Sequence, residues 1–142
     1  MSGPDLPKCR VLNVNDSHPE HLLLCQLLRP APDTLIEWSP SGIEALNALR
    51  GRADDELPHL VIIPWVLPLL TCQEFLLEMR TDLRLSRIPV FVLDNVPRDE
   101  LASLYAAGAR AVIAEGMTLD SLEKAAEGIR AACVKAGIIG LC

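Results

Sequence analysis

The sequence is short of aromatic residues and has no excess of positive charge. Phe, Trp and Tyr make up 4% of its 142 residues, so we expect a hydrophobic core built mainly from Leu, Ile, Val and Ala. The formal net charge is −6, whereas domains that bind nucleic acid usually carry a basic patch or stripe. We therefore predict that the protein makes no direct contact with DNA or RNA.

Long apolar segments are also missing. No apolar run approaches the ~20 residues that span a bilayer. The opening residues, MSGPDLPKCR, contain no apolar stretch typical of a signal peptide. We expect a cytoplasmic protein that does not enter the membrane.

The sequence lacks the spacings that usually mark metal, redox and nucleotide sites. Its cysteines are odd in number and form no C-x-x-C pair, which argues against a zinc site or a disulfide framework. They are Cys9, Cys25, Cys72, Cys133 and Cys142, and we expect buried free thiols at Cys25 and Cys133. The histidines are scattered, and we expect surface positions for them: His18, His21 and His59. There is no G-x-G-x-x-G, G-x-x-x-x-G-K-[ST] or H-E-x-x-H motif. No histidine is placed by the sequence to activate Cys72, so we predict neither enzymatic activity nor a cofactor.

One apolar segment organises the rest of the chain. Residues 57–68 read LPHLVIIPWVLP, and the run from Leu60 to Ile63 predicts a strand buried on both faces. Proline cannot donate to a sheet ladder, so this strand should end at Pro64. Ligands and chemistry gather beyond the carboxyl ends of strands in open α/β sheets. Pro64 therefore occupies a position where a reactive side chain is expected, and it has none.

Strand and helix patterns alternate five times along the chain, which predicts a doubly wound parallel α/β sheet with helices on both faces. We expect one domain over residues 8–137, a loose segment 1–7 and an apolar segment 138–142. The expected strands span residues 9–15, 34–38, 60–63, 88–93 and 111–114. The expected helices span about 18–29, 42–50, 71–80, 97–108 and 118–137, with Leu22, Ile43, Leu46 and Leu49 among their inward residues.

Four segments together resemble the receiver (CheY-like) domain of bacterial response regulators. They read VLNVNDS, LVIIPWVLP, RLSRIPVFVL and YAAGARAVIAEG, and the resemblance extends from about Lys8 to Gly137. It implies a flavodoxin-like, five-stranded sheet in the order 2-1-3-4-5.

The same resemblance implies that the chemistry of the family is lost. The family's two metal-binding acids fall on Asn15 and Asp16, its phosphoacceptor aspartate on Pro64, its hydroxyl residue on Asp94 and its lysine on Glu115. Only Asp16 keeps the expected residue type. Phosphoryl transfer needs an acceptor oxygen, a metal ion and a cation near the phosphoryl oxygens. We therefore predict a degenerate receiver, or pseudo-receiver, that is not phosphorylated at this site.

Two functions remain open at this stage. The first is a phosphorylation-independent protein–protein interaction module in two-component signal transduction, with a signalling protein or a second copy of the chain as partner. The resemblance places that contact on residues 97–137, although the exposed residues there are also typical of an ordinary solvated face. They are Arg98, Glu100, Arg110, Glu123, Lys124 and Glu127.

The alternative is a metal- or ligand-sensing domain in which Asp16, Asp94 and Glu115 form an acidic mouth. Carboxylate oxygens are suitable ligands for divalent cations. Without a cation, the three acids should repel one another, and Asp94→Asn should then stabilise the protein.

Overall fold

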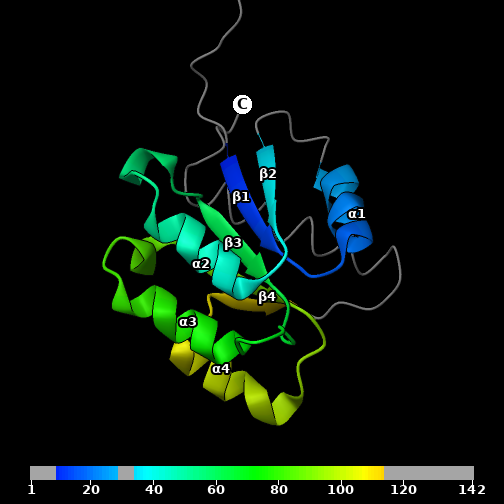
Figure 1. The fold of residues 1–142 in the computed structure, drawn as a ribbon. Helices are drawn as coiled ribbons and strands as arrows, with labels where there is room; N and C mark the ends of the chain where they lie inside the picture. Colours follow the sequence, from blue (N-terminus) through cyan, green and yellow to red (C-terminus); the bar gives the residue numbers. More distant parts are fainter. Residues whose placement is uncertain (1–8, 29–33, 114–142) are drawn as a thin grey trace, which may run out of the picture.

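The predicted alternation of strands and helices is present in the computed structural model, which describes residues 9–28 and 34–113 (Figure 1). The strands are β1 (Cys9–Val14), β2 (Thr34–Ser39), β3 (Leu60–Ile63), β4 (Val90–Leu93) and β5 (Ala111–Ile113). The α-helices are α1 (His18–Leu28), α2 (Gly42–Arg50), α3 (Cys72–Thr81) and α4 (Leu101–Ala107). Three 3₁₀ turns complete the described elements: η1 (Asp54–Glu56), η2 (Leu85–Arg87) and η3 (Arg98–Glu100).

The five strands form one parallel sheet in the order β2-β1-β3-β4-β5, which confirms the predicted topology. Side chains alternate between the two faces along each strand. On β1, Leu12 and Val14 join the hydrophobic cluster formed with α2, α3 and α4, whereas Asn13 contacts His21 of α1. Helices therefore cover both faces of the sheet, with α2, α3 and α4 side by side on one of them (Figure 1).

The local signals that end strands and begin helices act largely as expected. Strand β3 stops before Pro64, and all four of its residues are buried. Strand β4 begins at Val90 rather than at Ile88, because Pro89 has no N–H for the ladder. The hydroxyl of Ser41 accepts a hydrogen bond from the Glu44 N–H at the start of α2.

The fourth helical segment is tighter at its start than predicted. It opens with the 3₁₀ turn η3 after Pro97 and becomes α-helical only at Leu101. It ends, as expected, at Gly108, whose φ of +122° is a conformation that side chains with a Cβ rarely adopt. Glycine is thus required at this turn.

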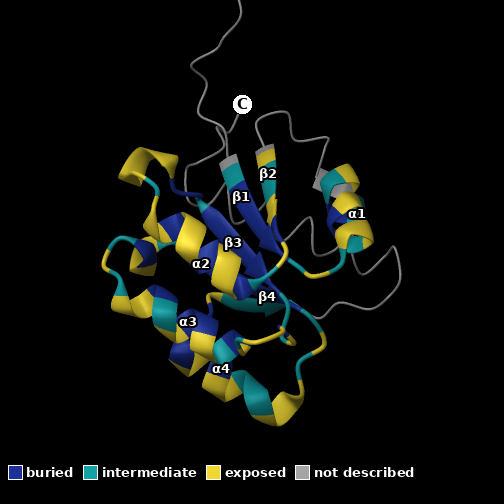
Figure 2. Cartoon of the chain, viewed as in Figure 1, coloured by how far each residue is buried: buried dark blue, intermediate teal, exposed yellow. Residues whose placement is uncertain are grey.

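The core lies between the sheet and α2, α3 and α4, as Figure 2 shows by the dark colour of most of β1, of β3 and of the inner helix faces. Its members are mostly Leu, Ile, Val and Ala, and Phe75 is the largest of the fully buried side chains. Within the described part of the chain, no helix is long and apolar enough to span a membrane. The predicted segments 1–7 and 138–142 and the predicted last helix lie outside the described residues.

Several predicted burial positions are wrong. Leu22 is 50% exposed and Ile43 is 40% exposed, although both were expected to point inward. His21, expected on the surface, is only 7% exposed. It lies on the inner face of α1, where the amide of Asn13 donates to its ring nitrogen. Cys25 is half-buried rather than buried, and Cys133 lies outside the described residues.

Candidate functional site

The candidate site lies at the edge of the sheet where the carboxyl ends of β1, β3 and β4 meet. Because the strands are parallel, the residues that follow them gather at this edge. Asn15 and Asp16 follow β1, Pro64 and Trp65 follow β3, and Asp94 follows β4. The fifth predicted position, Glu115, lies outside the described residues.

Asn15 uses both groups of its side-chain amide to hold the start of α1. Its Oδ1 accepts a hydrogen bond from the Ser17 N–H at 2.7 Å, and its Nδ2 donates to Glu20 Oε2 at 3.0 Å. An aspartate here could not donate to Glu20 and would place two carboxylates together. Asp16, in contrast, is exposed and makes no hydrogen bond with any residue that the structure describes.

Asp94 connects the ends of β3 and β4. One carboxylate oxygen, Oδ2, accepts the backbone N–H of Trp65 at 3.0 Å, and Oδ1 accepts the N–H of Asn95 at 2.8 Å. Trp65 directly follows Pro64, so the half-buried Asp94 places a carboxylate beside the residue that the sequence resemblance matched with the phosphoacceptor of receiver domains. Hydrogen bonds to an ionised acceptor are stronger than those between neutral groups.

This bonding changes the expectation for the acidic mouth. Both oxygens of Asp94 already have donors, and no group of three His, Cys, Asp or Glu side chains in the described ranges could hold a metal ion. The structure therefore gives a reason to reverse the expected effect of Asp94→Asn, from stabilising to destabilising. The metal-sensing alternative also involves Glu115 and stays a prediction.

The thiol of Cys72, at the first turn of α3, is buried beside this site. Burial raises its pKa to about 12, and the charge of Asp94 contributes in the same direction. A thiol is nucleophilic only as the thiolate. Cys72 is therefore a packing residue of the core.

The loop between β3 and α3 exposes apolar side chains that sequence reasoning did not single out. Val66 is 68% exposed and Leu69 is 90% exposed. Leu69 has a φ of +68° and is the central residue of a tight turn, in which the Leu70 N–H donates to the Pro68 carbonyl at 2.7 Å. Backbone strain of this kind often accompanies functional loops.

The predicted interaction face is described only in part. Arg98 and Arg110 are exposed and Glu100 is half-exposed, whereas Glu123, Lys124 and Glu127 lie outside the described residues. An additional residue on this side is Tyr105, which is 48% exposed. Its hydroxyl accepts the Val112 N–H of the edge strand β5 at 3.1 Å, so it covers a donor on an otherwise open edge.

Sequence reasoning also missed a polar cluster on the face of β1 that packs against α1, opposite the main core. Asn13 Nδ2 donates to His21 Nδ1 at 3.1 Å, and Cys25 Sγ lies 3.5 Å from His21 Nε2. Burial lowers the pKa of His21, and the neighbouring His18 lowers it further. The available signal was a polar residue between the apolar Leu12 and Val14 of the first strand, because a buried amide needs a partner.

No protein-family model matches the sequence, and no curated protein matches it significantly. Solved structures do resemble it. The phosphorylated cyanobacterial phytochrome response regulator RcpA is 24% identical with a TM-score of 0.78, covering 87% of this chain and 91% of RcpA. The Mn²⁺-bound response regulator Rcp1 is 25% identical with a TM-score of 0.75, covering 86% and 91%.

A third similar structure is the chemotaxis response regulator CheY4 of Vibrio cholerae, which is 20% identical with a TM-score of 0.72. It covers 86% of this chain and 98% of CheY4. The chain has the fold of a response-regulator receiver domain.

Proposed function

We propose that the protein is a pseudo-receiver, a non-catalytic and phosphorylation-independent protein–protein interaction module in bacterial two-component signalling. The observation that carries this proposal is the junction of β3 and β4. Pro64 offers no side-chain oxygen to a phosphoryl group, and the N–H of the next residue, Trp65, already donates to the Asp94 carboxylate. The Asp94 carboxylate thus occupies the backbone N–H that directly follows Pro64, the residue matched with the phosphoacceptor.

The described donor set also fits a divalent cation poorly. The side-chain oxygens of Asn15 and Asp94 already accept hydrogen bonds from backbone N–H groups. Of the three acids predicted to form the acidic mouth, Asp16 is the one described carboxylate without such a bond. Mg²⁺ in phosphoryl-transfer sites is held by carboxylates together with substrate oxygens. The proposed function therefore involves no metal ion.

The contact surface that we propose includes Arg98, Arg110 and Tyr105 on the α4–β5 side. The first two are exposed charges, and Tyr105 combines an exposed aromatic ring with a hydroxyl fixed by Val112. Arginine and tyrosine are common in protein interfaces because they offer large, specific contact areas. The partner is a signalling protein or a second copy of this chain.

The phosphorylation branch is tested by intact-mass spectrometry after incubation with acetyl phosphate and Mg²⁺. Wild-type protein should gain no phosphoryl group, and Pro64→Asp alone should gain little because Asp94 remains beside the new carboxylate. A combined variant, Asn15→Asp with Pro64→Asp, Asp94→Thr and Glu115→Lys, should do better because it restores acceptor, metal ligand, hydroxyl and cation. An acyl phosphate on the wild-type protein, or an efficient reaction of Pro64→Asp alone, would contradict the proposal.

The interaction branch needs a separate measurement. Light scattering over a range of concentrations detects self-association, and affinity capture followed by mass spectrometry detects a different partner. Arg110→Glu should weaken the complex, and acetyl phosphate should leave it unchanged. Lys8→Glu, a charge reversal far from α4 in the sequence, serves as a control. A complex that forms only after treatment with acetyl phosphate would refute phosphorylation independence.

A further inference from the structure

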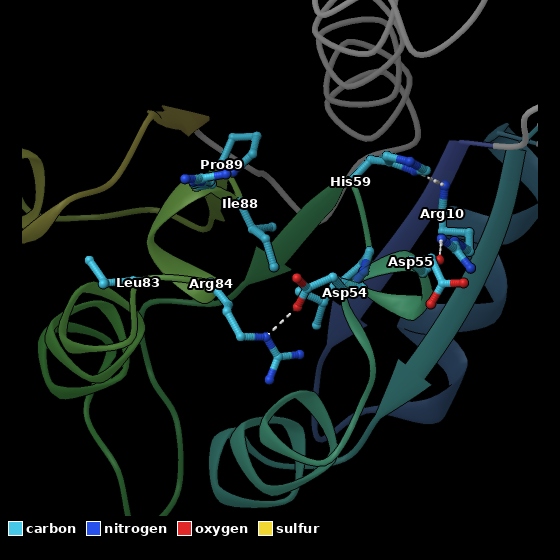
Figure 3. Close-up of a pocket in the computed structure, with 11 residues that line it drawn as sticks. Arg10, Asp54, Asp55, His59, Leu83, Arg84, Ile88 and Pro89 are labelled. Atoms are coloured by element: carbon cyan, nitrogen blue, oxygen red, sulfur yellow. Dashed lines mark hydrogen bonds and ion pairs between the residues drawn. The ribbon is translucent and has the colours of Figure 1, made fainter.

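A cavity of about 610 Å³ lies at the opposite edge of the sheet, where β3 and β4 begin (Figure 3). His59 precedes β3 and Pro89 precedes β4, while the segments around η1 and η2 form the sides. Cavities of about 300–1,000 Å³ are typical of sites for small organic molecules. This one is separate from the edge that carries Pro64 and Asp94.

The two sides of the cavity are tied together. Arg84, just before η2, donates from Nε to Asp54 Oδ1 of η1 at 2.5 Å and from Nη2 to the carbonyl of Arg52. Arg10 of β1 donates to the carbonyl of Asp55. Figure 3 shows Arg84 directed toward Asp54 across the space between the two segments. These bonds fix the shape of the cavity before any ligand binds.

The charge of the lining differs in sign from that of the chain. Three arginines and two aspartates line the cavity, an excess of one positive charge, whereas the whole chain has a net charge of −6. Asp54 is engaged by Arg84. Arg87 is exposed and has no hydrogen bond or ion pair with any residue that the structure describes. Its guanidinium is therefore available to an anion, which it can bind through two parallel hydrogen bonds.

His59 supplies a second donor. Its Nδ1 accepts the Arg10 N–H at 3.0 Å, so in the neutral ring the hydrogen is on Nε2. Burial and the charge of Arg10 lower the pKa of His59, so the neutral ring dominates at pH 7. Nε2 has no hydrogen-bond partner among the described residues, which leaves its N–H available to a ligand.

The remaining lining is apolar. Leu57 and Pro58 are buried, Ile88 and Pro89 are half-buried, and Leu83 on the rim is 84% exposed. Neither proline has an N–H, so the entrances to β3 and β4 offer few donors here. An apolar surface beside a small number of cationic and polar donors is the usual composition of a ligand site.

We propose that this cavity binds a small organic anion whose apolar body contacts Leu57, Pro58 and Ile88, whose carboxylate or phosphate group is held by Arg87, and to which His59 offers a further hydrogen bond elsewhere in the lining. The inference goes beyond the proposed function and does not depend on it. It concerns the other edge of the sheet and would hold for a chain with or without a phosphoacceptor.

The test is a titration of the full chain followed by ¹H–¹⁵N NMR. The probes are 1-naphthyl phosphate and 1-naphthoate, which join a flat apolar body to each kind of anion, with inorganic phosphate and 1-naphthol as the separate halves. The amides of His59, Arg87 and Ile88 should shift in a saturable way with either or both naphthyl anions, which also identifies the preferred group. Each half alone should bind at least about tenfold more weakly, because it lacks one set of contacts.

Arg87→Gln should weaken the binding of the naphthyl anions by about tenfold, as expected for the loss of a charge-assisted hydrogen bond. It should not disturb folding, because the side chain is exposed and unpaired within the described ranges. Arg50→Gln, at an exposed arginine at the end of α2 that does not line the cavity, is the control and should bind normally. The proposal is overturned if these amides show no saturable shift at millimolar probe, if 1-naphthol binds as well as the anions, or if both variants bind like the wild type.

Discussion

Replacing Asp94 should loosen the junction between β3 and β4. Its two carboxylate oxygens accept the backbone N–H groups of Trp65 and Asn95 at 3.0 and 2.8 Å. Alanine at this position removes both acceptors, whereas asparagine keeps one oxygen. We therefore expect stability to fall in the order wild type, Asp94→Asn, Asp94→Ala.

The magnitude follows from the hydrogen bonds and from the half-buried position of the side chain. A hydrogen bond to a charged group contributes about 1.5–3 kcal/mol when it is well shielded. Water can reach Asp94 and replace part of each bond, so we expect a loss of about 1–2 kcal/mol for Asp94→Ala and about half of that for Asp94→Asn. With a urea m-value of about 2 kcal/mol/M, the alanine variant should unfold at about 0.5–1 M less urea.

The assay is urea unfolding followed by tryptophan fluorescence at neutral pH. Asp16→Ala is the matched control, because Asp16 is an exposed carboxylate at the same edge without a hydrogen bond to any described residue. Its free energy of unfolding should change by no more than about 0.5 kcal/mol. If both Asp94 variants match this control, the carboxylate does not stabilise the junction. If Asp94→Asn unfolds at higher urea than the wild type, the acidic mouth is repulsive after all.

Three further predictions concern the glycine turn, the buried thiol and the buried histidine. Gly108→Ala should lower the free energy of unfolding by about 1–2 kcal/mol because its φ is +122°, whereas Gly51→Ala, at a φ of −87°, should be nearly neutral; urea unfolding measures both. Cys72, with a pKa raised to about 12, should resist alkylation by iodoacetamide at pH 8 in the folded protein and react in urea, as peptide mass spectrometry will show. His21 has a folded-state pKa below its ordinary 6.5, so the unfolded state takes up its proton first, and the stability that His21 contributes is full above about pH 6.5 and declines as pH falls below it. Urea midpoints at pH 7.5 and 5.5 should therefore differ less in His21→Gln than in the wild type.

Each of these predictions has an outcome that would contradict it. Equal losses for the two glycine variants would mean that the turn after α4 is not restricted to glycine. Alkylation of Cys72 within minutes in folded protein would place the thiol in contact with solvent. An unchanged pH dependence in His21→Gln would mean that His21 titrates alike in the folded and unfolded chain.

The strands and their order were predictable from the sequence because simple local rules govern them. Continuous apolar runs such as LVII mark strands buried on both faces, and Pro64 and Pro89 determine where two of them end or begin. Gly108 marked the end of α4 for an equally local reason. Each of these signals lies within a few residues of its effect.

Positions that depend on a partner from another element were not predictable in the same way. Hydrophobic periodicity placed Ile43 inward, and its position near a helix start placed His21 on the surface; in the structure Ile43 is 40% exposed and His21 is buried. His21 is buried because Asn13, eight residues earlier on β1, supplies a hydrogen-bond donor to its ring. A helical pattern reports which faces are apolar, but it does not report which polar residues find a partner across an interface.

The substitutions at the carboxyl edge show why a missing motif is only part of the argument. From the sequence alone, Asn15 and Asp94 are only departures from the pattern of the receiver domains that the chain resembles. In the structure, the Asn15 amide donates to Glu20, a bond that the family's aspartate could not make, and the Asp94 carboxylate takes the N–H beside Pro64. Both substitutions therefore have their own hydrogen-bond partners, and returning either to the family residue would leave one of those partners unsatisfied. A phosphorylation site introduced by these substitutions would therefore compete with contacts that stabilise the present fold.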